Sequence, residues 1–395
     1  MKAKQVKRNI IIFYILSIIQ GAFFIESNWI FLYLIYFNYE MLGFIDTIAF
    51  SIGLLLEIPS GAIADVIGRK KTVIMAMLLL SLGLLTQFFA SDQITIFIGN
   101  IIFFIGNAFY SGSMEALTFD TLVKNKDENN YEKIASIGRS LNSLANIIAV
   151  LLGGLLATIN IRYPFLLMAI FYFIGFIFSF SLTEPHIDSV KMTVKNYFDL
   201  IKSTIRDLRL PSIKPFLFFI ISILGISYWY EWGMIKPAIS VNLGYDSEQM
   251  GLIFSLSYLL IAILLPTIPK LRKWINDYTA ISILNFLLVL ALFLFGLNLG
   301  SWGFIPMLLI GAIGGLTTTW ISIIINEKIQ SSNRATILST IAMLLKIPYI
   351  FTAWISGYLI DQGYFSQLLF GIALIVGIFS FINLLKKQDL FKQKI

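Results

Sequence analysis

The sequence contains no cysteine, one histidine and few charged residues. Without cysteine the chain can form neither disulfide bonds nor thiolate metal sites. The histidine, His186, lies in a polar connection, where it cannot supply a proton relay inside a membrane. Charged residues make up 13% of the 395 residues and hydrophobic residues make up 58%. Such a composition cannot cover the surface of a water-soluble protein, so we expect the lipid bilayer to be the solvent.

The patterns that carry enzyme chemistry are missing as well. The chain has no phosphate-binding glycine loop, no catalytic triad and no carboxylates at metal-ligand spacing. We therefore expect no enzyme activity, no cofactor and no bound metal. With no ATP site, any transport cycle would draw on an ion gradient or on the gradient of the substrate itself.

Long apolar runs dominate what is present, and the mean hydropathy is +0.84. A spanning helix needs about 20 apolar residues, which leaves room for twelve spans. All lysines and arginines except Arg162, Lys236 and Lys346 fall in alternate connections, at the adjoining helix ends or in the tails. Because cytoplasmic loops carry the excess of positive residues, we expect a multi-pass plasma-membrane protein with both termini in the cytoplasm. The net charge of +7 then reflects topology and not a nucleic-acid partner.

The chain is predicted to form two six-helix halves, residues 1–183 and 213–395, joined by a cytoplasmic linker at 184–212. Apolar residues recur at helical spacing in the linker, which predicts an amphipathic helix on the inner leaflet. The run Glu-Lys-Ile at 132–134 recurs at 327–329, where we expect it to open the fifth and eleventh spans. Residues 21–26 likewise match 225–231, inside the first and seventh helices. Transporters built from such repeats bind substrate near the midplane, between the repeats.

One loop carries a recognisable motif. Its residues follow the spacing G-x-x-x-D-x-x-G-R-K-K and are Gly61, Asp65, Gly68, Arg69, Lys70 and Lys71. The motif resembles the loop between the second and third helices of the major facilitator superfamily. The resemblance covers the whole chain, with twelve spans, a 6+6 division and inner termini. It implies an all-α membrane protein whose two six-helix pseudo-repeat bundles surround a central cavity.

In that superfamily this loop holds the cytoplasmic side shut in one state of the transport cycle. The resemblance implies that Gly61 allows close helix approach, that Asp65 satisfies free N–H groups at the next helix start, and that Arg69 reaches Asp120. The second-half loop at 270–273 keeps basic charge but lacks the glycine and the aspartate. We therefore expect a weaker latch in the second half.

The fifth helix differs from a related pattern. Antiporters of the superfamily often show G-x-x-x-G-P-x-x-G-G there, and this chain keeps small residues without the proline. The corresponding residues are Ala145, Ala149, Val150, Gly153 and Gly154. Close helix packing is expected to persist.

Charged residues inside the spans each cost about 2.5–3.5 kcal/mol, so each calls for a reason. Glu57, Glu115 and Arg139 fall near the inner ends of their spans, close to the loop motif. We interpret them as an inner-gate network with Asp65, Arg69 and Asp120. Asp46 and Lys236 fall near the outer boundary, where we expect water or snorkelling to accommodate their charge.

Glu26, Glu231 and Lys346 lie deeper in the spans. If the halves surround one cavity, the three side chains could share it. An apolar environment favours the neutral form of a carboxylic acid, so Glu26 or Glu231 is a candidate proton carrier. The alternative is a permanent structural pair with Lys346.

Aromatic and amide residues surround these charges in the sequence, which suits an amphipathic organic ligand. The cavity candidates are Gln20, Asn28, Trp29, Trp229, Tyr230 and Trp232. For Trp29 and Trp232 the alternative is an interfacial anchor.

The sequence thus predicts a monomeric secondary transporter that moves a small organic solute by alternating access. Proton-coupled efflux of an amphipathic or drug-like compound is the favoured reading, with protons as the coupling ion. Uptake or facilitated passage of an organic anion, read by Lys346, is the second. A membrane receptor or scaffold that does not transport is the third, and the embedded charges argue against it.

Overall fold

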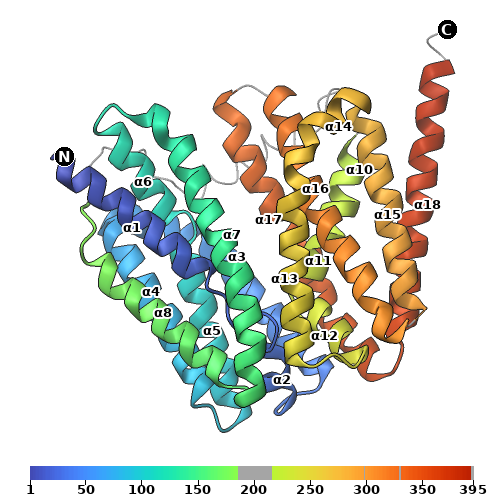
Figure 1. Cartoon of the computed structure of the whole chain (residues 1–395), viewed down its shortest axis with the longest axis horizontal. Helices are drawn as coiled ribbons and strands as arrows, with labels where there is room; N and C mark the ends of the chain where they lie inside the picture. The colour runs from blue at the N-terminus through green and yellow to red at the C-terminus, as the bar shows by residue number, and fades with distance from the viewer. Residues whose placement is uncertain (186–215, 298, 329–330, 393–395) are drawn as a thin grey trace. The chain divides into compact units, whose positions relative to one another are not determined.

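The computed structural model divides the chain into two compact units, which we describe separately (Figure 1). Unit 1 comprises Met1–Phe37, Ile48–Phe198 and Ser247–Ser255, and unit 2 comprises Asn38–Thr47, Asp199–Asp246 and Leu256–Ile395. Two short segments, 38–47 and 247–255, therefore group outside the half to which the sequence assigns them.

The structure describes residues 1–185, 216–297, 299–328 and 331–392. Within these ranges it leaves undescribed the side chains at 57–59, 61, 62, 65, 326, 328, 331–340, 342, 343 and 383–392. The predicted amphipathic linker helix and His186 lie outside the described residues.

All secondary-structure elements in the described ranges are helices. In unit 1 they are α1 (Ala3–Gly21), α2 (Trp29–Leu34), α4 (Arg69–Phe88), α5 (Gln93–Tyr110), α6 (Ser113–Val123), η1 (Glu128–Asn130), α7 (Tyr131–Ile159) and α8 (Tyr163–Ser179). In unit 2 they are α10 (Leu217–Phe219), η3 (Ile220–Leu224), α11 (Gly225–Glu231), α12 (Ile235–Asn242), η4 (Leu265–Thr267), α14 (Ile268–Trp274), α15 (Asp277–Gly296), η5 (Gly300–Gly303), α16 (Phe304–Lys328), α17 (Ser331–Asp361) and α18 (Phe365–Lys392). Helices α3 (Tyr39–Ile67) and α13 (Ser247–Leu264) contribute to both units.

The chain is an all-α membrane protein. In the described part, eight helices are long and apolar enough to cross a membrane, and a ninth span results if α10–α11 and α12 are counted as one bent helix. The other predicted spans correspond to α1 with α2, to the 17-residue apolar α8 and to the 31-residue α17. Twelve spans remain the prediction from the sequence.

Small residues set the helix spacing inside each unit. In unit 1, α4 lies against α5 and α8 (Figure 1). A Cβ added at Gly83 would lie 2.7 Å from the backbone nitrogen of Phe103, so α4 and α5 touch through their backbones. In unit 2, α15 and α18 run side by side, and a Cβ at Gly296 would lie 2.6 Å from the Phe370 ring. Interhelical spacing of this kind depends on the missing side chain.

The first and seventh spans are both broken. Helix α1 ends at Gly21, residues 24–28 form turns, and α2 begins at Trp29. In the seventh span the axis bends by 64° between Leu217–Glu231 and Ile235–Asn242. The expectation that Glu26 lies inside a helix is therefore wrong, because the helix stops five residues earlier. Glu231 is the last residue of α11.

The second repeat match also needs correction. Glu132 lies in the first turn of α7, the fifth span, but Glu327 lies in the last turn of α16 and does not open the eleventh span. The apolar run of α16 carries the helix on to Lys328, and α17 starts at Ser331. The two Glu-Lys-Ile runs thus occupy different places in their units.

Candidate functional site

The break in the seventh span carries a buried ion pair. Lys236 Nζ lies 2.8 Å from Glu231 Oε2, and the two side chains are 3% and 21% exposed. The ammonium also lies 5.2 Å from the centroid of the Tyr258 ring, within the range of a cation–π contact. The expectation that Lys236 snorkels to water is therefore wrong. Its charge is balanced by Glu231, which the sequence associates instead with Lys346.

Glycines of α16 make room for this pair. A Cβ at Gly311 would lie 3.3 Å from Glu231 Oε1, and one at Gly314 would lie 3.0 Å from the Ser227 hydroxyl oxygen. Ser227 and Glu231 are one helical turn apart on α11, so both face the glycine surface of α16. A larger residue at Gly311 would compete with the carboxylate for space.

A tyrosine holds the other side of the same break. The hydroxyl oxygen of Tyr349, on α17, accepts a hydrogen bond from the Met234 backbone N–H at 3.0 Å. The same hydroxyl donates to the carboxylate of Asp46 on α3. A Cβ at Gly233 would lie 1.8 Å from the Tyr349 oxygen, so only glycine fits between Trp232 and Met234. Asp46 is buried, and the expectation that water reaches its charge is wrong.

Further contacts tie the start of α3 to α17 in unit 2, and we call this region the α3–α17 seam (residues 39–47 and 349–361). The carboxylate of Asp361 accepts hydrogen bonds from the backbone N–H groups of Tyr39 and Glu40 at 3.2 and 2.7 Å. It therefore satisfies the free N–H groups at the start of α3. Added Cβ atoms at Gly43 and Gly357 would lie 2.3 and 2.1 Å from backbone oxygens of the facing helix.

The break in the first span lies on α7 in unit 1. A Cβ at Gly21 would lie 2.1 Å from the carbonyl oxygen of Asn142, and one at Gly153 would lie 1.8 Å from that of Phe24. The Ser27 hydroxyl donates to the carbonyl of Val150 at 3.2 Å. Glu26 lies in this break and is partly buried. Glu26 belongs to unit 1, whereas Glu231 and Lys346 belong to unit 2, and a shared cavity stays a prediction.

Three buried amide atoms near this break have no hydrogen-bond partner among the described residues. They are Gln20 Nε2, Asn28 Oδ1 and Asn146 Oδ1. The other ends of two of these side chains are engaged, because Gln20 Oε1 accepts from the Tyr172 hydroxyl at 3.3 Å and Asn28 Nδ2 donates to the Phe24 carbonyl at 2.8 Å. Buried polar atoms are rarely left unpaired, so these three are available to a ligand or to water.

The aromatic candidates divide by exposure. Trp229 and Tyr230 are buried, and the ring of Tyr230 packs against Phe295. Trp232 is 67% exposed and stacks on Tyr228 with 6.0 Å between ring centroids. In unit 1, Trp29 meets the edge of Tyr33 at 5.2 Å. Trp232 and Trp29 are thus the more accessible members of the predicted set.

The loop motif brings three elements together at the start of α4. The guanidinium of Arg69 forms an ion pair with Asp120 of α6. The carboxylate of Glu184 accepts hydrogen bonds from the backbone N–H groups of Arg69 at 2.9 Å and Lys70 at 2.7 Å. Gly68 has φ +98°, a conformation that glycine adopts without strain.

Of the other predicted gate residues, only Glu115 and Arg139 have described side chains, and neither makes an ion pair with Arg69 or Asp120. The side chains of Glu57 and Asp65, and the surroundings of Gly61, lie outside the described residues. Glu115 and Arg139 are both exposed, and neither makes an ion pair with another described residue. A gate network that includes them stays a prediction.

Unit 2 has its own arginine cluster. The sequence predicts that this cluster forms a weaker latch than the loop motif of unit 1. Arg272 of α14 contacts Asp277 at 2.8 and 3.0 Å and Glu327 at 2.6 and 2.7 Å, with two hydrogen bonds to each carboxylate. Trp320 Nε1 also donates to Asp277 at 2.7 Å. The described contacts of the first latch leave out those of masked side chains such as Asp65, so a weaker second latch stays a prediction.

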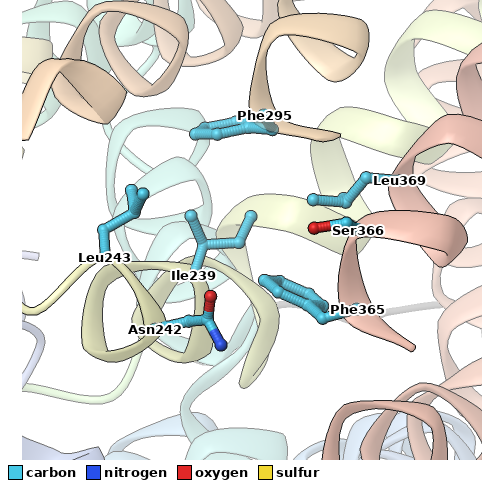
Figure 2. Close-up of a pocket in the computed structure, with 7 residues that line it drawn as sticks. All are labelled: Ile239, Asn242, Leu243, Phe295, Phe365, Ser366 and Leu369. Carbon is cyan, nitrogen blue, oxygen red and sulfur yellow. The ribbon is translucent and has the colours of Figure 1, made fainter. Parts of the chain in front are cut away.

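A small pocket elsewhere in unit 2 holds no charged group (Figure 2). Its lining residues are Ile239, Asn242, Leu243, Phe295, Phe365, Ser366 and Leu369. They come from α12, the end of α15 and the start of α18. The pocket contains none of the predicted site residues and offers no group that could couple transport to an ion gradient.

Comparisons with known proteins agree with this architecture. The family model described as Major Facilitator Superfamily matches residues 9–351. A protein of Bacillus subtilis (strain 168), named "Uncharacterized MFS-type transporter YxaM", is 28% identical over 284 residues, covering 69% of this chain and 70% of that protein. Among solved structures, the nucleoside transporter NupG superposes with a TM-score of 0.72 at 14% identity, covering 97% of this chain and 98% of that one. A D-xylose-proton symporter gives a TM-score of 0.67 at 14% identity, covering 95% and 97%.

Proposed function

We propose, from the premise that this chain belongs to the Major Facilitator Superfamily, that it exports an amphipathic organic compound in exchange for protons. The family is one of membrane transporters and not of enzymes. The proposal adds the coupling ion, the direction and the class of solute, with alternating access as the mechanism. We place the protein in the plasma membrane with both termini in the cytoplasm.

The Glu231–Lys236 pair carries the proposal. Taking two charges out of water is costly even when they attract each other, so a buried pair at a helix break calls for a role beyond stability. Protonation of Glu231 would remove the negative partner of Lys236, whose side chain is only 3% exposed. The charge balance at the break would then change, so the break responds to proton binding. A transporter requires such a link between proton binding and conformation.

The accessible groups favour an amphipathic solute. Trp232 and Tyr228 offer stacked rings in unit 2, and unit 1 offers the unpaired amide atoms of Gln20, Asn28 and Asn146. Ligand sites combine apolar walls with a few well-placed polar groups. Each unit by itself thus offers one part of such a site: stacked rings for a planar or aromatic group in unit 2, and amide atoms for a polar substituent in unit 1.

The missing proline of α7 counts against export, and close packing is the part of the antiporter pattern that this helix keeps. The antiporter pattern that the fifth helix resembles consists of small residues, and two of them make backbone contacts here. Gly153 lies against Phe24 in the break of the first span, and a Cβ at Gly154 would lie 2.5 Å from the carbonyl oxygen of Ser247 on α13. The small residues therefore serve close packing although the proline is missing.

Uptake of an organic anion is the second candidate, and Lys346 favours it. This lysine is partly buried on α17, one turn before Tyr349. An ammonium at that depth would attract a carboxylate or phosphate group. Replacing Lys346 with Gln should then weaken transport of anions far more than that of cations. Equal effects on both would remove Lys346 from the substrate site.

The test is transport by the purified protein in liposomes. Ethidium serves as the amphipathic probe, beside a panel of toxic compounds chosen by growth of cells with and without the protein. An inside-acid gradient should drive accumulation of a transported compound, and adding that compound without a gradient should move protons, read with a trapped pH dye. Glu231→Gln should abolish gradient-driven accumulation. Movement of a compound without any proton flux would contradict proton coupling and leave facilitated passage.

A further inference from the structure

Asp46 is a buried carboxylate with an unusual setting. It lies in the second turn of α3, is 7% exposed, and accepts a hydrogen bond from the hydroxyl of Tyr349, which is fully buried. In the described part of the chain no lysine or arginine forms an ion pair with it. By contrast, Glu231 has Lys236.

The partners of Asp46 lead to the break in the seventh span. The Tyr349 oxygen accepts the backbone N–H of Met234 at 3.0 Å, and Met234 is the residue that precedes the first turn of α12. N–H groups at a helix start have no partner within their own helix. Tyr349 therefore supplies the acceptor that the broken helix lacks, and Asp46 fixes the direction in which that hydroxyl points.

Other titratable groups surround this chain of hydrogen bonds. Lys346 precedes Tyr349 by one turn on α17, and the ring of Tyr228 on α11 meets Tyr349 edge to face at 6.4 Å. Glu231 and Lys236 flank Met234 in the sequence and neutralise each other. On α3 itself Glu40 accepts a hydrogen bond from Trp354 at 3.2 Å.

We propose that Asp46 is a proton-binding site of the transporter, and that Tyr349 transmits its protonation state to the break that carries Glu231 and Lys236. This inference rests on the proposed function and adds a second coupling group to it. Burial without a paired cation makes an ionised carboxylate costly, so proton binding at this position has a large effect on the local energy.

The chemistry involves one proton and no other reactant. While Asp46 is ionised, the Tyr349 hydroxyl donates to it in a charge-assisted hydrogen bond, which is about twice as strong as a neutral one. A proton taken from water onto a carboxylate oxygen removes that charge. The weakened bond lets the O–H group rotate, so the lone pairs of the Tyr349 oxygen are no longer held toward the Met234 N–H. Proton binding on α3 thus loosens the start of α12 and alters the setting of the Glu231–Lys236 pair.

The proposal is tested by infrared difference spectroscopy between two pH values on the purified full-length protein. The carbonyl stretch of protonated carboxylic acids should grow on acidification in the wild type, and Asp46→Asn should lose one component of that band. In Tyr349→Phe the band should remain but shift, because its hydrogen-bond partner is gone. The matched controls are Asp361→Asn, a carboxylate of the same seam, and Tyr358→Phe, an exposed tyrosine of α17. Both should keep the wild-type band.

An unchanged band in Asp46→Asn, with the protein monodisperse, would overturn the proposal. If Asp46→Asn does not fold, Tyr349→Phe tests the proposal instead. A carbonyl band that neither shifts nor changes its titration midpoint in Tyr349→Phe would exclude a hydrogen bond between Asp46 and Tyr349. Transport assays separate this outcome from the fate of the proposed function. If Asp46→Asn retains proton-driven transport, the role of Asp46 is disproved and the proposed function stands. If Asp46 titrates but the wild type shows no proton-driven transport, the proton coupling in the proposed function is disproved.

Discussion

The carboxylate of Glu184 accepts the backbone N–H of Arg69 at 2.9 Å, across 115 residues of sequence. Its second oxygen accepts the N–H of Lys70. Glu184 therefore caps α4 from the end of the sixth span, while the Arg69 side chain reaches Asp120. The motif depends on this carboxylate for the helix start that positions its arginine.

Removing the cap should destabilise unit 1. We expect Glu184→Ala to lower the free energy of unfolding by about 0.5–2 kcal/mol, the usual cost of losing a helix cap. Glu184→Gln keeps an acceptor and should lose less. The midpoint of thermal unfolding in detergent measures both, and Glu128→Ala, an exposed glutamate of η1, is the control. Equal midpoints for all variants would show that the cap contributes nothing.

The Glu231–Lys236 pair gives a double-mutant cycle. Lys236→Met alone leaves a partly buried carboxylate without its cation and should cost stability, though less than the about 3–5 kcal/mol of a fully buried charge. Adding Glu231→Gln removes the stranded charge and should restore most of that loss, because neutral replacement of a buried pair is often tolerated. Gradient-driven transport should stay absent in the double variant. Additive losses in the unfolding midpoint would mean that the two side chains do not interact.

The α3–α17 seam should tolerate no added side chains. Gly43→Ala and Gly357→Ala each place a Cβ within 2.3 Å of a backbone oxygen, so the helices must separate. We expect each to cost about 1–3 kcal/mol, as overpacking does. Gly371→Ala on α18 is the matched control, because no atom lies within 4 Å of its added Cβ. It should be neutral or stabilising by up to about 1 kcal/mol, since alanine favours helix over glycine. If the seam variants match the control, the contact is not maintained in solution.

Asp92 provides a pH-dependent cap at the start of α5. Hydrogen bonds from the backbone N–H and the hydroxyl of Thr95 hold the pKa of this carboxyl below its usual value. A carboxyl whose pKa is lower in the folded state adds stability above its unfolded pKa and loses it as pH falls through the folded value. Asp92→Asn should therefore flatten the acid side of the stability profile, with little change near neutral pH. Parallel profiles for the two proteins from neutral to acid pH would rule the cap out as a titrating group.

Contacts within the loop motif could be predicted from the sequence. Contacts that depend on the breaks in the first and seventh helical spans could not. The pairing of Arg69 with Asp120 follows from a loop of fixed spacing beside the end of a helix. The sequence favours Lys346 as the partner of Glu231, because Lys346 falls deep in its span and Lys236 falls near the outer boundary. The 64° bend between α11 and α12 brings Lys236 to Glu231 instead. Hydropathy places Asp46 at a water-exposed boundary. A hydropathy profile cannot show that Tyr349, 303 residues further along the chain, covers Asp46 in the fold.

Glu184 illustrates a second limit. It lies at the end of a span, where a charged residue is ordinary, and nothing in its local sequence distinguishes it from a linker residue. Its role appears only when the end of the sixth span meets the start of α4. Arg272 is recognisable from sequence as the counterpart of the motif arginine. Its carboxylate partners, Asp277 and Glu327, belong to the next two helices and follow from their packing.

The orientation in the membrane can be tested directly, because the chain has no cysteine and each introduced thiol is unique. The basic connections predict that Lys7 and Lys133 face the cytoplasm and that Ser91 and Gln362, beyond α4 and α17, face outside. All four side chains are exposed. A membrane-impermeant maleimide should label Ser91→Cys and Gln362→Cys in intact cells, but Lys7→Cys and Lys133→Cys only after permeabilisation. The reverse pattern would place both termini outside, and the direction of export proposed here would then be reversed with them.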